Sequence, residues 1–252
     1  MDEREVARLR GNRIAYISQE PMGALDPCFT VGYLLCEPLR LHRGMTKVQA
    51  QVRAAELLRL VGIHEPERVL RHRAHELSGG MAQRVCIALA LTGEPDLLIA
   101  DEPTTALDVT VQAEILDLLR SLRDRLGMAV LLVTHDLGVV ADLCDRAVVM
   151  YAGQVVEEGD VEQVLTSPAH PCTQAPRAAS AEHAVPGVPL VTVSGTVPSP
   201  REWADGCRFE GRCPYATEAC VEHPPELLDQ PDERRVRCVR VAELPLAERI
   251  PQ

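Results

Sequence analysis

Apolar and polar positions follow two distinct patterns in the first two thirds of the chain. Leu97–Ala100 and Met128–Val133 are nearly continuous apolar runs, which is typical of strands buried on both faces of a parallel sheet. Around them, apolar residues recur every three or four positions, which is typical of amphipathic helices. Strands that alternate with helices in this way predict an α/β protein.

Three stretches carry clear helix signals. Thr46 followed by Gln49 predicts a capping box, and the helix that it begins should stop at Gly62. Met81–Thr92 and Val109–Leu126 also have helical periodicity. The apolar positions expected on the buried faces of the first and third helices are Val48, Val52, Ala55 and Leu58, and Val111, Ile115, Leu118, Leu119 and Leu122.

Shorter strands are expected near both ends of this region. Arg13–Gln19 holds a short apolar run that leads into polar residues. Ala147–Tyr151 and Gln154–Glu157 flank Gly153 and predict a hairpin.

Composition divides the chain into three parts. Residues 1–167 carry the alternating signals, with a helical subdomain expected at about 30–92. Residues 168–200 are rich in Pro, Ala, Val and Ser, and we expect a linker there. Residues 201–252 contain four cysteines and little apolar periodicity. A small element of this kind often needs a metal or cross-links to be stable.

Charge and hydropathy exclude several classes of protein. A net charge of −11 argues against a nucleic-acid-binding surface. No apolar run reaches the length needed to span a bilayer, and the charged N-terminal residues do not resemble a signal segment. We therefore expect a cytosolic protein that meets a membrane through a partner. In that compartment the nine cysteines should be reduced or metal-bound rather than paired in disulfides.

Two short motifs suggest phosphate chemistry. Ser78, Gly79 and Gly80 precede a predicted helix, and glycines at a helix N-terminus let backbone amides approach a phosphate closely. Asp101 and Glu102 end a predicted strand. One carboxylate at such a position can hold Mg²⁺, and the next can polarise an attacking water.

The longer segments around these residues resemble the ATP-binding subunits of ABC transporters. Residues 77–84 resemble the ABC signature, and residues 101–108 resemble the Walker B and D-loop segment. His135 matches the switch histidine and Gln19 matches the Q-loop. Met81 within the signature points to the oligopeptide/dipeptide/nickel-type importers. The resemblance implies an ABC-type nucleotide-binding domain, P-loop NTPase-like and N-terminally incomplete, with a small cysteine-rich C-terminal extension.

The same resemblance implies ATP and Mg²⁺ as cofactors and gives each residue a role. Asp101 would hold Mg²⁺, Glu102 would act on the water, and His135 and Gln19 would position the γ-phosphate and its ligands. The signature would contact the γ-phosphate held by the opposite subunit. The residues so assigned to nucleotide or Mg²⁺ binding are Gln19, Ser78, Gly79, Gly80, Asp101 and Asp108.

The sequence departs from the family at the phosphate-binding loop. It contains no Gly-x-x-x-x-Gly-Lys-Ser/Thr motif, and the only lysine, Lys47, lies outside any such pattern. Three explanations compete: a truncated or misassigned start, which we favour; a degenerate subunit that lends its signature to a partner's site; and one piece of a split domain. On any of them we expect negligible ATP hydrolysis by this chain alone, because that loop binds the β- and γ-phosphates.

Four cysteines mark the C-terminal extension. Cys207, Cys213, Cys220 and Cys238 are separated by five, six and seventeen residues, which is not the spacing of a common zinc ribbon. Four thiolates suit a [4Fe–4S] cluster or a zinc ion equally by number, and unligated thiols remain the third alternative. Some relatives in the resembled family carry an iron–sulfur cluster on such cysteines, so we favour the cluster and expect the four side chains to converge. At Cys172 the resembled family usually has a tyrosine.

The leading interpretation is the ATP-binding and ATP-hydrolysing subunit of an ABC importer for peptides or similar small solutes, in truncated form. Its expected partners are a second ABC ATPase subunit, identical or different, the transmembrane permease subunits, and indirectly an extracytoplasmic solute-binding protein, but not nucleic acid. Its expected place is peripheral, on the cytoplasmic side of the membrane. The alternative is a non-hydrolysing regulatory partner. A soluble ABC-type ATPase of repair or translation fits less well, because of the tail and the missing basic patch.

Overall fold

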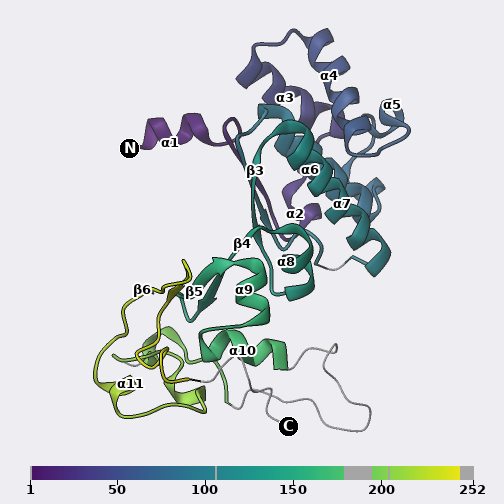
Figure 1. Ribbon diagram of the computed structural model, residues 1–252. Coiled ribbons are helices and arrows are strands. Elements are labelled where there is room, and N and C mark those ends of the chain that lie inside the picture. Colours follow the sequence, from purple (N-terminus) through teal and green to yellow (C-terminus); the bar gives the residue numbers. More distant parts are fainter. Residues whose placement is uncertain (1, 106, 179–194, 204, 245–252) are drawn as a thin grey trace. The chain divides into compact units, whose positions relative to one another are not determined.

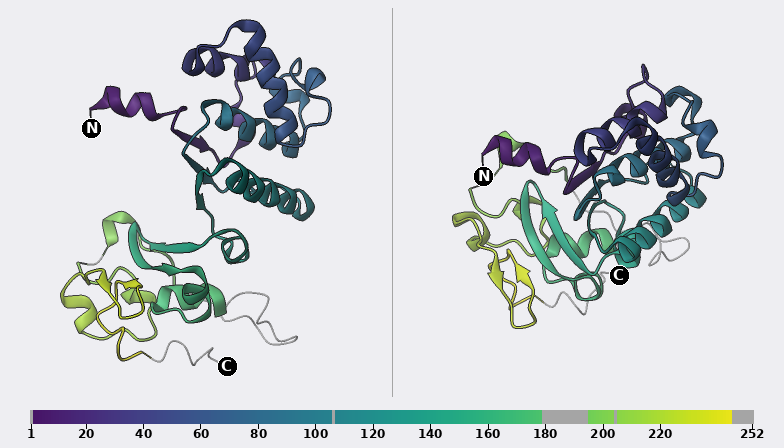
Figure 2. Two further views of the ribbon diagram at one scale, coloured as in Figure 1. Left: turned by 45° about the horizontal axis from the view of Figure 1, so that its top comes forward. Right: turned by 90° about the horizontal axis from the view of Figure 1, so that it is seen from above.

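The computed structural model describes residues 2–105, 107–178, 195–203 and 205–244, and it separates into two compact units (Figures 1 and 2). The first unit comprises Met1–His135 and the second Asp136–Gln252. Each unit has its own sheet.

A parallel sheet organises the first unit. Its strands are β1 (Ile14–Ile17), β2 (Leu97–Asp101) and β3 (Ala129–Val133), in the order β1-β2-β3. Strand β2 pairs in parallel with both of its neighbours, so the predicted α/β architecture is confirmed. The short helix α1 (Glu3–Leu9) precedes β1, and none of its residues is buried.

The prediction that both apolar runs are buried on both faces is wrong for β3. Leu98 and Ala100 of β2 are fully buried, but Leu131 and Val133 of β3 are 51% and 47% exposed. Successive side chains of a strand point to opposite faces, and Leu131 and Val133 lie on a sheet face that the described part of the chain leaves open. Tyr16 of β1, in register with them on that face, is 57% exposed as well.

Helices occupy most of the segment between β1 and β2, as the predicted helical subdomain requires (Figure 1). Thr30 and Thr46 cap the two longest of them, and Thr46 forms the predicted capping box with Gln49. Gly44 closes the first of these helices in the left-handed region, at φ 64°. The elements are α2 (Pro21–Ala24), α3 (Val31–Arg43), α4 (Lys47–Leu60), α5 (Pro66–Val69), η1 (Ala74–Glu76), α6 (Gly79–Ala90) and η2 (Leu91–Gly93).

The buried face of α4 differs from the predicted one. Val48 and Val52 are 70% and 56% exposed, although Leu58 is buried as expected. Since α4 packs against both α3 and α6, the side rich in alanine turns inward, because small side chains let helices approach closely. The buried residues of this helix are Ala50, Ala54, Ala55, Leu57 and Leu58.

Helix α7 (Val109–Leu126) has the predicted bounds. The side chain of Asp108 caps its start by accepting a hydrogen bond from the Val111 amide, and Gly127 ends it at φ 65°. Three residues of the predicted apolar stripe are buried: Ile115, Leu119 and Leu122. Leu116 is also buried, whereas the predicted Leu118 is only half-buried.

The second unit is built on an antiparallel sheet in the order β4-β5-β7-β6. Strands β4 (Arg146–Tyr151) and β5 (Gln154–Asp160) form the predicted hairpin. Ala152 and Gly153 turn between them with φ 45° and 77°, the left-handed pair that suits a two-residue hairpin turn. The other elements are α8 (Leu137–Leu143), α9 (Val161–Thr166), α10 (Pro171–Ala178), η4 (Pro200–Glu202), η5 (Glu210–Arg212), α11 (Ala219–Glu222), β6 (Leu228–Asp229) and β7 (Arg235–Val236).

The predicted linker and extension have more structure than their composition indicates. Helix α10 forms inside the segment 168–200, while residues 179–194 lie outside the described residues. Strand β7 comes from the cysteine-bearing segment and pairs with β5, through Val236 and Glu157. The domain boundaries at 167 and 200 therefore stay predictions.

Two buried polar side chains fix this second unit. Glu157 is fully buried and accepts hydrogen bonds from the amides of Ala169 and His170 at 2.8 and 3.0 Å. Arg234 lies 3.6 Å from the same carboxylate and donates to the Ser167 carbonyl. His170 is 1% exposed, and its Nδ1 accepts from the Cys172 amide at 3.0 Å. These contacts hold β5, the start of α10 and the segment before β7 together.

Burial lowers the pKa of His170 to about 4, and a stability prediction follows. Because the unfolded chain takes up the proton near pH 6.5 and the folded chain does not, this group's stabilising contribution falls as the pH drops from about 6.5 to 4, by on the order of 3 kcal/mol. His170→Asn keeps an acceptor near the Cys172 amide and removes the titration. Urea unfolding between pH 7 and 4 should therefore show a flatter loss of stability in the variant. Parallel curves for the two proteins would contradict this prediction.

Candidate functional site

Three side chains meet where the three parallel strands end. Gln19, Glu102 and His135 follow β1, β2 and β3, whose carboxyl ends lie at the same edge of the sheet. Gln19 Nε2 donates to Glu102 Oε2 at 3.2 Å, and His135 Nδ1 lies 2.8 Å from Glu102 Oε1. All three residues were candidates from the sequence, and the fold brings them together.

The backbone of Glu102 is itself unusual. Its φ is 44°, in the left-handed region that costs a non-glycine residue about 1 kcal/mol or more. The Glu102 amide donates to the Val133 carbonyl at 2.8 Å, and Thr105 Oγ1 donates to Glu102 Oε2 at 2.6 Å. These bonds hold the turn and aim the carboxylate at the neighbouring strand ends.

The hydrogen bonds also set the charge of this carboxylate. The bond from Thr105, and next the bond and charge of His135, lower the pKa of Glu102. Glu102 is therefore ionised at neutral pH and acts as an acceptor for donors placed at the strand ends. Its side chain is 21% exposed and that of His135 is 79% exposed, so both can reach a ligand that arrives from solvent.

Asp101 has a partner that the sequence did not reveal. Tyr16 on β1 donates its hydroxyl to Asp101 Oδ2 at 2.8 Å. This bond is the largest cause of the raised pKa of Tyr16. This bond restrains one oxygen of the carboxylate and leaves the other available to a ligand. Thr105 was not identified from the sequence either, although a residue three positions after Glu102 can reach its side chain. The role of Tyr16 could be recognised only from the pairing of β1 with β2.

The signature residues lie at the start of α6. Ser78 caps the helix by accepting from the Met81 amide at 3.3 Å, and Gly79 and Gly80 are the first helical residues. A Cβ at Gly80 would lie 2.9 Å from Val111 Cγ1 in the first turn of α7, whereas one at Gly79 would make only an ordinary contact. Gly80 thus leaves room for Val111, apart from any role at a phosphate.

Helix α6 is tied to its neighbours by Arg84. Its guanidinium donates to the Val61 carbonyl and to Glu114, both at 2.7 Å. Gly62, at φ 80°, leaves the space for this side chain, since a Cβ there would lie 2.7 Å from Arg84 Nη1. The start of α6 is therefore held relative to α4 and α7.

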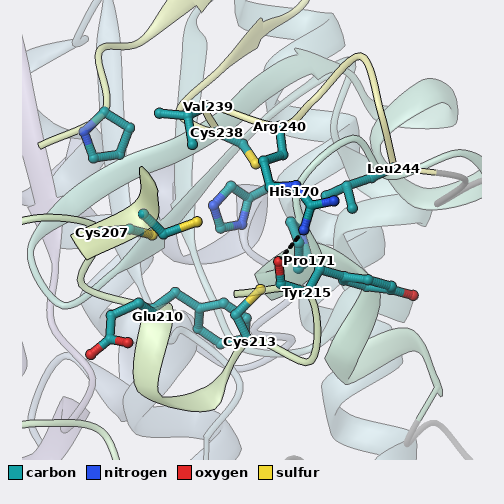
Figure 3. A pocket seen from close by; sticks show the side chains of 13 residues that line it. His170, Pro171, Cys207, Glu210, Cys213, Tyr215, Cys238, Val239, Arg240 and Leu244 are labelled. Carbon is teal, nitrogen blue, oxygen red and sulfur yellow. Dashed lines mark hydrogen bonds between the residues drawn. The ribbon is translucent and has the colours of Figure 1, made fainter. Parts of the chain in front are cut away.

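The cysteines of the C-terminal segment surround a small cavity in the second unit (Figure 3). All four of the cysteines singled out in the sequence line this space of about 20 Å³, together with His170 and Arg240. Burial raises the pKa of three of these thiols, that of Cys213 to about 11. Among the described residues, however, no group of three or more His, Cys, Asp or Glu side chains is positioned to hold a metal ion. The metal centre therefore stays a prediction.

Comparison with known proteins identifies the family. The model of the ABC transporter family matches residues 1–105, and that of the oligopeptide/dipeptide transporter C-terminal region matches residues 156–220. The chain is 46% identical to a probable peptide ABC transporter ATP-binding protein of Sinorhizobium fredii, over 97% of this chain and 73% of that protein. This chain belongs to the ATP-binding proteins of peptide ABC transporters.

Other members of this family support the assignment. The dipeptide transport ATP-binding protein DppD of Escherichia coli is 45% identical, over 94% of this chain and 73% of its own length. The oligopeptide transport ATP-binding protein AppD of Bacillus subtilis is 43% identical, over 94% of this chain and 72% of its own length.

Solved structures confirm the ABC fold. A dimeric ATP-binding cassette bound to ADP and Pi matches with a TM-score of 0.57 and 33% identity, over 64% of this chain and 68% of that chain. Within the described residues, no helix is both long and apolar enough to cross a membrane.

The two signature glycines should respond differently to substitution. Gly80→Ala should destabilise the chain by about 1 kcal/mol, because the new methyl meets Val111. Gly79→Ala should be neutral or stabilise it by up to about 1 kcal/mol, since alanine favours helix. In a Val111→Ala background the cost of Gly80→Ala should shrink. Urea unfolding of the four variants measures these differences, and an equal cost for both glycines would contradict the packing argument.

Proposed function

We propose that this chain is the ATP-binding and ATP-hydrolysing subunit of an ABC importer for peptides or similar small solutes. The observation that carries the proposal is the convergence of Gln19, Glu102 and His135 at one edge of the parallel sheet, beside Asp101. The names of the relatives support peptides as the solute class. An intact cluster of this kind weighs against a partner that has lost the chemistry.

The geometry suits the roles that we assign to these side chains. Glu102 is ionised and held by two hydrogen bonds from other side chains and by the contact with His135, so it can orient an attacking water. His135 and Gln19 flank the carboxylate and would contact the γ-phosphate side of ATP. Asp101, fixed by the Tyr16 hydroxyl, offers the oxygen donor that Mg²⁺ prefers. The ion would neutralise phosphate charge during the transfer.

A second nucleotide contact is proposed at the start of α6. Ser78, Gly79 and Gly80 present the N-terminal end of a 12-residue helix, where amides and the helix dipole favour an anion. We assign these residues, with Asp108 at the start of α7, to the nucleotide held by a second ABC ATPase subunit. Two of the solved structures that this chain resembles are dimers. The remaining proposed partners are transmembrane permease subunits, which this chain would meet from the cytoplasmic side of the membrane, and, through them, an extracytoplasmic solute-binding protein.

This composite site can be tested by mixing. The chain is combined with a full-length peptide-importer ATPase subunit that has an inactivating Ser→Arg change in its own signature, and phosphate release from Mg-ATP is measured. We expect turnover well above the sum of the separate proteins, and at least a tenfold loss with Ser78→Arg, because the arginine fills the space at the helix start.

The control for this experiment is Ser121→Arg, at an exposed position on α7, which should leave turnover unchanged. Circular dichroism must show that Ser78→Arg is folded, since losing the cap costs about 1 kcal/mol. A folded Ser78→Arg chain that supports full turnover would show that its signature serves no partner.

We further propose a metal centre on Cys207, Cys213, Cys220 and Cys238, with a [4Fe–4S] cluster favoured over zinc. The support is that all four line one cavity and that thiolates are the ligands both metals accept. The four side chains would have to move toward one another, because the described arrangement does not itself form a ligand set. The role would be structural or redox-sensing, as ATP hydrolysis requires no electron transfer.

Purification without oxygen tests the centre. We expect a brown protein whose broad visible absorption disappears when any one of the four cysteines becomes Ser, while Cys144→Ser, elsewhere in the second unit, retains it. A colourless preparation with one zinc per chain would replace the cluster by zinc at the same site. Protein with neither metal would contradict both forms of the proposal.

A further inference from the structure

A fifth thiol lies beside the four that line the cavity. Cys172, on the first turn of α10, packs against the buried apolar cluster of Tyr151, Val156 and Phe209. Cys207 packs against the same cluster, and so does Cys213. If the other four cysteines bind a metal, Cys172 is a nearby thiol that is not one of the ligands.

Backbone hydrogen bonds hold the segments that carry Cys172 and Cys207. The Cys172 amide donates to His170 Nδ1, and the His170 amide donates to the buried carboxylate of Glu157. On the other side, the Cys207 amide donates to the Cys220 carbonyl at 2.7 Å. Gly206 makes that approach possible, since a Cβ there would lie 2.3 Å from the same carbonyl oxygen. Both segments that carry these thiols are thus held by hydrogen bonds where they pack against the apolar cluster.

The apolar cluster against which both thiols pack is itself well packed. Tyr151 and Phe209 meet edge to face with ring centroids 5.0 Å apart, and Phe209 is 3% exposed. Cys172 and Cys207 are each only half-buried, so a small oxidant can reach their edge of the cluster. The two thiols thus pack against one cluster and are both partly accessible, and access is one of the conditions for exchange with a disulfide.

We propose that Cys172 and Cys207 form a reversible disulfide when the four-cysteine site holds no metal. The oxidant is a small-molecule disulfide such as oxidised glutathione. The Cys207 thiolate attacks one of its sulfurs and releases one small thiol; the Cys172 thiolate then attacks the mixed disulfide and releases the second. Two protein S–H bonds become one S–S bond, and two electrons and two protons pass to the small disulfide, which becomes two thiols.

The disulfide would replace the metal as the cross-link of this segment. It would join the start of α10 to the segment that carries Cys207. When metal is bound, the metal would hold that second segment through its cysteine ligands. Burial raises the pKa of Cys172 to about 12, although the charge of Arg212 opposes the shift. The thiol is therefore mostly protonated at neutral pH, and exchange should take hours rather than seconds.

Peptide mapping of the full chain tests the pairing directly. Trypsin cleaves after Lys and Arg, so it places Cys172 on peptide 147–177, Cys207 on 202–208 and Cys238 on 238–240, while Cys213 and Cys220 share peptide 213–234. The protein is incubated overnight with oxidised glutathione and EDTA, blocked with iodoacetamide and digested. We expect the linked pair of 147–177 and 202–208 to be the main cross-link, and dithiothreitol to abolish it.

Two variants sharpen the result. Cys172→Ser should abolish the cross-link between 147–177 and 202–208, because the only cysteine of peptide 147–177 is gone. Cys144→Ser should give the wild-type cross-link. The wild-type map decides the question even if Cys172→Ser does not fold. A main cross-link between any other two peptides, glutathione retained on Cys207 of the wild-type chain, or unmodified thiols after incubation would overturn the proposal.

Discussion

The carboxylate of Glu102 is the point on which the first unit depends. A parallel sheet places the carboxyl ends of all its strands at one edge, so residues far apart in the chain arrive there together. Gln19 and His135 come from the two strands on either side, and both contact the same carboxylate. The left-handed turn at Glu102 is the local cost of this arrangement. The bonds from Thr105 and to the Val133 carbonyl stabilise it.

The second unit depends on a different constraint, the burial of Glu157. A fully buried carboxylate must be matched by donors, and two amides with Arg234 supply them. In meeting that requirement they bring β5, the start of α10 and the segment before β7 together. The cysteine-lined cavity is a consequence, because His170 forms part of its wall. Thus one buried carboxylate helps to organise the segment in which four cysteines line a cavity.

Packing and ligand chemistry share residues at the start of α6. The glycines there are the residue type that a phosphate contact requires, yet Gly80 is also the position where a Cβ would come within 2.9 Å of Val111 in the first turn of α7. Arg84 joins the same helix to the end of α4 and to α7. Residues of the signature segment therefore also hold α4, α6 and α7 together, in addition to the phosphate contact that we propose.

Local features were determined by the sequence itself. The capping box at Thr46, the bounds of α7 and the hairpin around Gly153 depend on contacts within a few residues, so short patterns predict them. The motif residues Gln19, Glu102 and His135 were also identifiable, because the short segments around them resemble motifs of ABC ATPases.

Only the tertiary structure decided which faces and which distant residues meet. The buried side of α4 was predicted wrongly because α3 and α6 both pack against it, and periodicity contains no information about two neighbours at once. The bond from Tyr16 to Asp101 depends on the pairing of β1 with β2. The contact of Cys172 and Cys207 with one apolar cluster arises from segments well separated in the chain. In each case the deciding free energy comes from packing and pairing between segments, which a local pattern does not contain.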